Sequence, residues 1–140
     1  MMKLHKDSHL DHGLSPEQVD FLLKTFADRD GFFIASVELP VGTIESRLYG
    51  PKAGDAPVAE AEVHYARRGD RKYPSRLVHK PSRKTSTVTV IAGPHEGESC
   101  VLYTAFGGPP TPREPGDETL PEKERQESLD FWSVHALAVD

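Results

Sequence analysis

The sequence predicts an α+β protein in which an N-terminal helix, a mostly antiparallel four- to six-stranded sheet and a C-terminal helix follow one another. Three observations lead to this class. Residues 16–29 carry a helical pattern, residues 33–106 carry short β-type runs separated by turn residues, and residues 121–137 return to a helical pattern. A length of 140 residues is typical of one domain, so we expect a single domain over residues 1–140.

The first helix is expected at about Pro16–Arg29, after a polar segment (residues 1–13) that we expect to be mobile. Ser15 and Gln18 have the spacing of a capping box, and Pro16 suits the first helical position. Apolar residues then recur at helical spacing, at Val19, Leu22, Leu23 and Phe26. Gly31 ends the pattern in the usual way.

The strands are predicted from β-branched and alternating runs. FFIASVELP alternates its apolar residues and stops at Pro40, and weaker runs lie at 43–50, 62–69 and in SRLVHKP. TSTVTVIAGP and SCVLYTAFGG are the strongest, and the intervening GPHEGE predicts a hairpin loop. Because both strands of this hairpin are apolar on both faces, we expect them at the centre of the sheet.

Two features close the chain. GGPPTPREPGD, residues 107–117, holds four prolines and three glycines, which predicts a stiff surface loop without helix or strand. PEKERQESLDFWSVHAL begins with Pro121 and places Leu129, Trp132 and Ala136 on one apolar stripe. This pattern predicts a last helix.

Composition limits the classes of function. The formal net charge is −5, which argues against generic nucleic-acid binding. The single cysteine, Cys100, allows no intrachain disulfide and suits a reducing compartment. No apolar leader or run of 18 apolar residues is present, so we expect a cytoplasmic protein without a membrane partner.

Positive charge is concentrated in residues 62–84, the basic stretch. It holds eight basic and two acidic residues, a net of +6, so the rest of the chain sums to −11. Arginines in such a stretch can bind phosphate, RNA or a carboxylate ligand. Alternatively, they are solvated residues of edge strands, or they neutralise the acidic residues 94–140.

Only a subset of these cations can converge on one site. Alternation along residues 62–69 places His64 and Arg68 on one face of the strand and Arg67 with Tyr65 on the other. We expect Thr87 or Thr89 to join the first face from a neighbouring strand. The predicted catalytic residues are His64, Arg68 and Arg76, and the predicted ligand-binding residues are Arg67, Thr87, Thr89, Tyr103 and Arg113.

The same residue types could cleave RNA without a metal. His64 would remove the 2′-OH proton, arginines would stabilise the developing charge, and His79 or Tyr103 would protonate the leaving oxygen. One helix followed by antiparallel basic strands, over about residues 15–106, resembles the layout of the small barnase- and RelE-like ribonuclease toxins. TVTVIAGPHEGESCVLYTAFGGPPTPREPGD also resembles a small family of uncharacterised bacterial-type proteins, which implies a shared fold and no particular activity.

A metal site has one weak candidate. His5, His9 and His12 would share one face if their segment were helical, and imidazole is a common zinc or nickel ligand. We expect no cofactor. The favoured function is binding of a small anionic or nucleotide-type ligand, with or without catalysis. The alternatives are a metal-independent ribonuclease or RNA-binding module, and an interaction protein whose basic and acidic faces pair, including between copies of the chain.

Overall fold

The computed structural model describes residues 3–10, 14–67 and 74–139, and over residues 3–10 it describes the backbone alone. The α+β class is confirmed, with helices and strands in the order given below. The chain forms two compact units, Met1–Ser46 with Arg83–Pro110 and Arg47–Ser82 with Thr111–Asp140, and each is described by itself. The prediction of a single domain stays a prediction.

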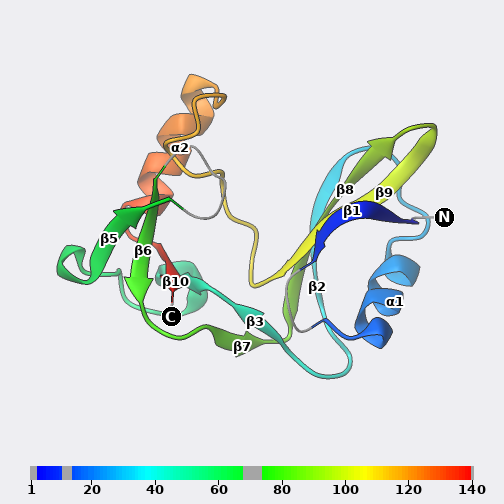
Figure 1. The fold of residues 1–140 in the computed structure, drawn as a ribbon, viewed down its shortest axis with the longest axis horizontal. Helices are drawn as coiled ribbons and strands as arrows, with labels where there is room; N and C mark the ends of the chain where they lie inside the picture. Colours follow the sequence, from blue (N-terminus) through cyan, green and yellow to red (C-terminus); the bar gives the residue numbers. More distant parts are fainter. Residues whose placement is uncertain (1–2, 11–13, 68–73, 140) are drawn as a thin grey trace. The chain divides into compact units, whose positions relative to one another are not determined.

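The first unit is built on a four-stranded sheet of order β1-β9-β8-β2 (Figure 1). β9 pairs parallel with β1, whereas β8 pairs antiparallel with both β9 and β2. The predicted hairpin therefore lies at the sheet centre, as expected. A separate antiparallel pair joins two short strands. The strands are β1 (Lys3–Leu10), β2 (Phe33–Glu38), β3 (Ile44–Ser46), β7 (Arg83–Thr85), β8 (Thr87–His95) and β9 (Glu98–Gly107).

Helix α1 (Pro16–Thr25) packs its apolar side on one face of this sheet. The capping box is present: Ser15 accepts a hydrogen bond from the Gln18 backbone, and the Gln18 side chain accepts one from the Ser15 backbone. Leu22 and Phe26 are buried with Val88, Val90 and Leu102 in the core of the unit. The helix ends four residues before the predicted Arg29.

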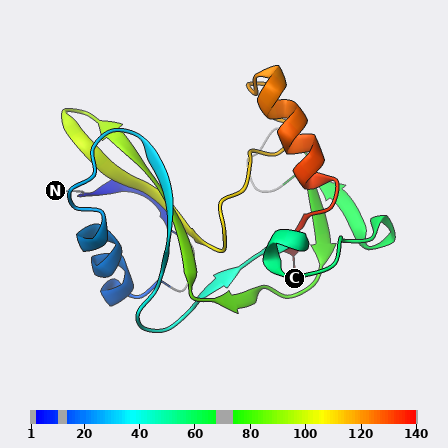
Figure 2. The same cartoon turned by 180° about the vertical axis from the view of Figure 1, so that it is seen from behind.

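The second unit contains a four-stranded sheet of order β4-β10-β6-β5. β6 pairs antiparallel with β5 and parallel with β10. The elements are β4 (Leu48–Tyr49), β5 (Val63–Ala66), β6 (Ser75–His79), helix α2 (Glu122–Trp132), β10 (Ala136–Val139) and the short 3₁₀ helices η1 (Pro51–Ala53) and η2 (Glu60–Glu62). Figure 2 shows α2 leading into β10, and β5 and β6 as the green hairpin.

Three details differ from the sequence prediction. The strands form two four-stranded sheets and one two-stranded sheet, rather than one sheet. The last helix stops at Trp132, and residues 136–139, which continue an apolar run, form a strand between β4 and β6 instead. Residues 3–10, inside the segment expected to be mobile, form β1. Residues 108–121 contain no helix or strand, as their prolines predict.

Candidate functional site

Within the basic stretch, Val63–Ala66 and Ser75–His79 form the antiparallel pair β5–β6, whereas Arg83 and Lys84 belong to β7 in the first unit. The register of β5–β6 places His64 opposite Leu77 and Tyr65 opposite Arg76. Because directly opposed residues share a face of the sheet and neighbours along a strand alternate, His64 and His79 lie on one face, and Tyr65 and Arg76 lie on the other. His64 and Arg76, which the sequence predicted as catalytic residues of one site, therefore lie on opposite faces of the pair.

His64 and His79 are in direct contact on their face. Their imidazole rings stack with centroids 4.5 Å apart and an interplanar angle of 16°. His64 is half-buried and His79 is exposed. Two imidazole edges so close together can both reach oxygens of a single anion, because an N–H···O hydrogen bond spans about 2.9 Å. His79, which sequence reasoning named only as an alternative acid, therefore belongs to the site.

Arg76 is buried and tied to its own chain. One terminal nitrogen, Nη1, donates to the backbone carbonyls of Trp132 and His135 at the end of α2. The other, Nη2, contacts Oε2 of Glu60 at 3.0 Å. A cation at this place also interacts favourably with the C-terminal end of the helix dipole. Arg76 thus joins β6 to α2, and it does not project toward the His64 face.

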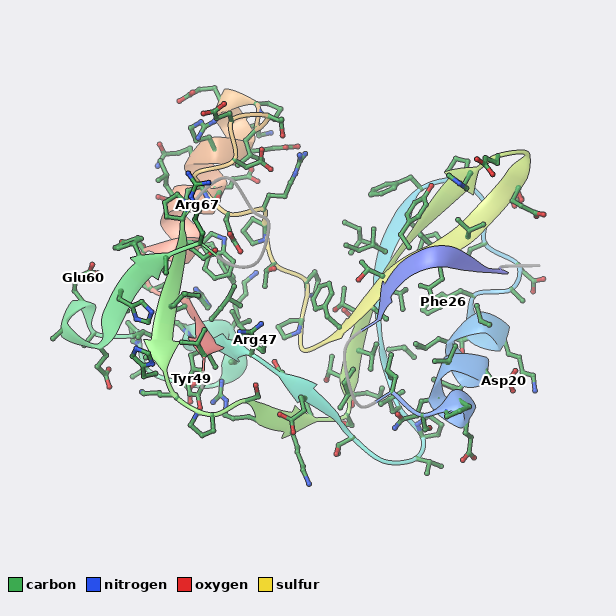
Figure 3. The ribbon with its side chains drawn as sticks, in the orientation of Figure 1. Asp20, Phe26, Arg47, Tyr49, Glu60 and Arg67 are labelled. Carbon is green, nitrogen blue, oxygen red and sulfur yellow. The ribbon has the colours of Figure 1, made fainter. Side chains whose placement is uncertain are left out.

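Acidic residues just before β5 compensate part of the basic stretch. Glu60 pairs with Arg76, and Glu62 pairs with Lys80 at 3.3 Å. Lys80 also lies 5.3 Å from the ring centre of Tyr49. The exposed Arg67 follows the last residue of β5, whereas Glu60 precedes its first residue, so the two lie at opposite ends of the strand (Figure 3). The predicted residue Arg68 lies outside the described residues.

Three of the predicted ligand-binding residues belong to the first unit and to a different sheet from His64. β8 pairs with β2 and β9, whereas β5 pairs with β6, so the prediction that Thr87 or Thr89 adjoins residues 62–69 on a neighbouring strand is wrong. Thr89 is fully buried and donates to the Gly108 carbonyl, and Thr87 donates to Glu38. Tyr103 donates its hydroxyl to the Pro94 carbonyl.

Arg113 lies in the proline-rich loop, in the second unit. Its guanidinium donates to Thr119 and lies 3.8 Å from the carboxylates of Asp117 and Glu124. The same loop contains the buried Glu114, which accepts a hydrogen bond from Ser75 of β6. These contacts connect the loop to β6, to the following turn and to the first turn of α2.

A buried histidine supports the end of α2. His135 is stacked on Phe131 with ring centroids 3.7 Å apart, and its Nδ1–H donates to the Phe131 carbonyl. Its Nε2 accepts from the backbone N–H of Lys52 at 3.2 Å, which requires the neutral ring. Burial, reinforced by the charges of Lys52 and Arg76, lowers the pKa of His135, although the Phe131 carbonyl opposes this shift.

The proposed metal site has no structural support. Backbone residues 5 and 9 lie in strand β1 rather than in the helix that the histidine spacing requires, and His12 lies outside the described residues. Among the described residues, no three side chains of the metal-ligating types cluster closely enough to hold an ion.

Neither described helix has the length and hydrophobicity needed to cross a membrane.

Two contacts could not have been found from sequence patterns. The pairing of His64 with His79 depends on the register of β5 and β6, and that of Glu60 with Arg76 depends on the turn before β5. The only available signal was the presence of both histidines in a basic stretch of alternating residues.

Comparisons with protein-family models, curated proteins and solved structures found no match for this chain.

Proposed function

We propose that this protein binds a small anionic ligand, of the phosphate or nucleotide type, at the His64–His79 pair. The observation that carries the proposal is the contact of two imidazole rings, 4.5 Å apart, on an accessible part of the β5–β6 hairpin. Each imidazole ring carries an N–H group that can donate a hydrogen bond to an anion oxygen. The predominance of basic over acidic residues in this part of the sequence favours anions over metal cations.

The exposed ring of His79 also favours a nucleotide over free phosphate. One face of the His79 ring stacks on His64, and an exposed aromatic face can stack on a nucleobase. A nucleoside monophosphate would then place its phosphate at the imidazole edges and its base against His79. Inorganic phosphate would have only the first of these contacts.

The test is a titration of the histidine ring signals by NMR with inorganic phosphate and with a nucleoside monophosphate. The signals of His64 and His79 should shift together, with tighter binding of the nucleotide. His64→Gln and His79→Gln should each weaken binding about tenfold, since each removes one charge-assisted hydrogen bond of roughly 1.5 kcal/mol or more.

His95→Gln is the matched control, because His95 lies at the β8–β9 hairpin in the first unit and should not affect binding. Shifts confined to one of the two rings, or unchanged affinity in both variants, would refute the site. A response to zinc in place of phosphate would identify a metal-binding pair instead.

Cleavage of RNA without a metal is the second candidate function. The specific observation is that two imidazoles share one surface, which is what a base and an acid acting on opposite sides of one phosphate require. Arg76 cannot stabilise the transition state there, because it lies on the other face of the hairpin and donates to α2. Arg68, which the sequence predicted for that role, lies outside the described residues.

This candidate predicts shortening of single-stranded RNA in EDTA, with a bell-shaped pH profile. Removal of either histidine should lower the rate by about 10² to 10⁴, the usual contribution of a general acid or base. Intact RNA after incubation with protein that binds a nucleotide would leave ligand binding as the function and exclude the nuclease.

A further inference from the structure

The opposite face of the β5–β6 hairpin carries the buried Arg76. Arg76 is only 6% exposed, and its cross-strand neighbour Tyr65 is 58% exposed. Directly opposed residues on a sheet have Cβ atoms about 5 Å apart, so the tyrosine ring is within reach of the arginine. This position is separate from the imidazole pair, which occupies the other face.

The guanidinium is held rigidly by its inner nitrogen. Nη1 donates to two carbonyl oxygens at the end of α2, those of Trp132 and His135, the second at 2.9 Å. A guanidinium is planar, so fixing one nitrogen on two acceptors also fixes the direction of the opposite edge, formed by Nη2 and Nε. That edge is the part that binds a carboxylate with two parallel hydrogen bonds.

Only half of this edge is satisfied within the described part of the chain. Nη2 donates to a single oxygen of Glu60 at 3.0 Å, and the Nε–H of Arg76 is buried without a hydrogen-bond partner. A buried donor without a partner is costly and uncommon in folded proteins. Glu60 therefore leaves the rigid fork incompletely filled.

The Glu60 carboxylate can also separate readily from Arg76. Its side chain is 71% exposed, whereas that of Arg76 is 5% exposed. It projects from the short η2 helix, one turn before β5. Exposed carboxylates in such pairs are held weakly, because water competes for the same charges.

We propose that the Nε–Nη2 edge of Arg76 is a binding site for a free carboxylate, which displaces Glu60 and engages both nitrogens. Glu60 acts as an internal competitor that fills the site when the ligand is absent. The exposed Tyr65 ring favours an aromatic carboxylate over an aliphatic one. This inference does not depend on the His64–His79 site, and either can fail without the other.

The experiment follows the Nε–Hε signals of arginine in ¹⁵N spectra, with the signal of Arg76 assigned by its loss in Arg76→Lys. Sodium benzoate and sodium acetate are titrated separately. In the wild-type protein, benzoate should shift the Arg76 signal more strongly than acetate does. In Glu60→Ala, both should bind about two- to fivefold more tightly, the factor expected when an exposed ion pair no longer competes.

Two variants serve as controls. Glu62→Ala removes the same charge two residues away, from the pair with Lys80, and should leave the affinity at Arg76 unchanged. Tyr65→Ala should reduce the preference for benzoate over acetate to about one, by removing the aromatic surface. If Arg76→Lys does not fold, the signal can be assigned from its response to Glu60→Ala, because Glu60 contacts that guanidinium directly.

The outcomes separate a binding site from a structural arginine. Tighter binding in Glu60→Ala but not in Glu62→Ala would support displacement. No shift of the Arg76 signal with either carboxylate, in the wild type and in Glu60→Ala, would show that Arg76 only joins β6 to α2. Equal tightening in both alanine variants would show a general charge effect and would overturn the proposal as well.

Discussion

Gly50, between β4 and η1, is a position where an added methyl group should destabilise the fold strongly. Its φ is +135° and its ψ −177°, a backbone conformation that is essentially confined to glycine. A Cβ built there would lie 2.4 Å from Cδ2 of His135 and 2.8 Å from the carbonyl oxygen of Val134. Gly50→Ala therefore combines backbone strain with overlap.

The magnitude follows from these two terms. A non-glycine residue in such a region costs about 1–3 kcal/mol, and inserting a methyl group into a packed contact costs about 1–3 kcal/mol more. His135 cannot move away easily, because its ring is held between the Phe131 carbonyl and the Lys52 backbone N–H. We expect Gly50→Ala to lower the free energy of unfolding by about 2–6 kcal/mol.

Gly54 is the matched control, four residues away in the same turn. Its φ is +86°, but no heavy atom lies within 4 Å of an added Cβ. Gly54→Ala should therefore cost only the backbone term, about 1–2 kcal/mol. Urea unfolding followed by tryptophan fluorescence measures both, since Trp132 is buried in the same unit. If the two variants unfolded at the same urea concentration, the close contact with His135 would not exist.

Three further predictions concern stability and reactivity. Burial lowers the pKa of His135 below its ordinary 6.5, so its neutral form stabilises the fold fully above pH 6.5 and progressively less as the pH falls through the pKa of the folded state. The difference in unfolding free energy between the wild type and His135→Gln should therefore shrink as the pH falls below 6.5, and a constant difference would contradict this prediction. Leu22→Ala should cost about 2–5 kcal/mol in urea unfolding, because Leu22 is fully buried, whereas Leu129→Ala, at a side chain 47% exposed, should cost far less. Burial raises the pKa of the Cys100 thiol, so a thiol reagent should modify it slowly in the folded protein and rapidly in urea, and equal rates would place it at the surface.

The elements that the sequence predicted well are those with strong local signals. The capping box at Ser15 and the apolar spacing from Val19 to Phe26 define α1 without reference to the rest of the fold. The β8–β9 hairpin was correctly placed at a sheet centre, because long apolar runs are typical of inner strands. In these cases the local pattern and the tertiary environment agree.

The end of the chain shows why other elements were not predicted. Helical spacing placed Leu129, Trp132 and Ala136 on one stripe, yet Leu129 is exposed and Ala136 belongs to β10. Residues 136–139 fill the position between β4 and β6, and this pairing partner is distant in the sequence. Strand pairing of this kind overrides local propensity, because it satisfies backbone groups that a frayed helix end would leave open.

The candidate site was predicted only in part, because it too depends on the pairing of strands. Strand alternation correctly separated His64 from Tyr65, but the position of Arg76 depends on the register between β5 and β6, which single-strand patterns do not contain. A shift by one residue would have placed Arg76 opposite His64 and Ser75 opposite Tyr65. The observed register directs the arginine to α2 and leaves the two histidines together.

The arrangement of charge in the basic stretch now has a physical explanation. A cation buried beneath a sheet requires acceptors, and Arg76 finds them in the carbonyls at the end of α2 and in Glu60. Lys80 is matched in the same way by Glu62, so two of the eight basic residues are neutralised by the acids that precede β5. Such pairing does not require the acidic residues 94–140, which the sequence offered as partners. The His64–His79 face has no comparable acid among its described contacts. We therefore expect an anion added from solution to bind at this face at a lower concentration than at Arg76 or Lys80, where a carboxylate already competes.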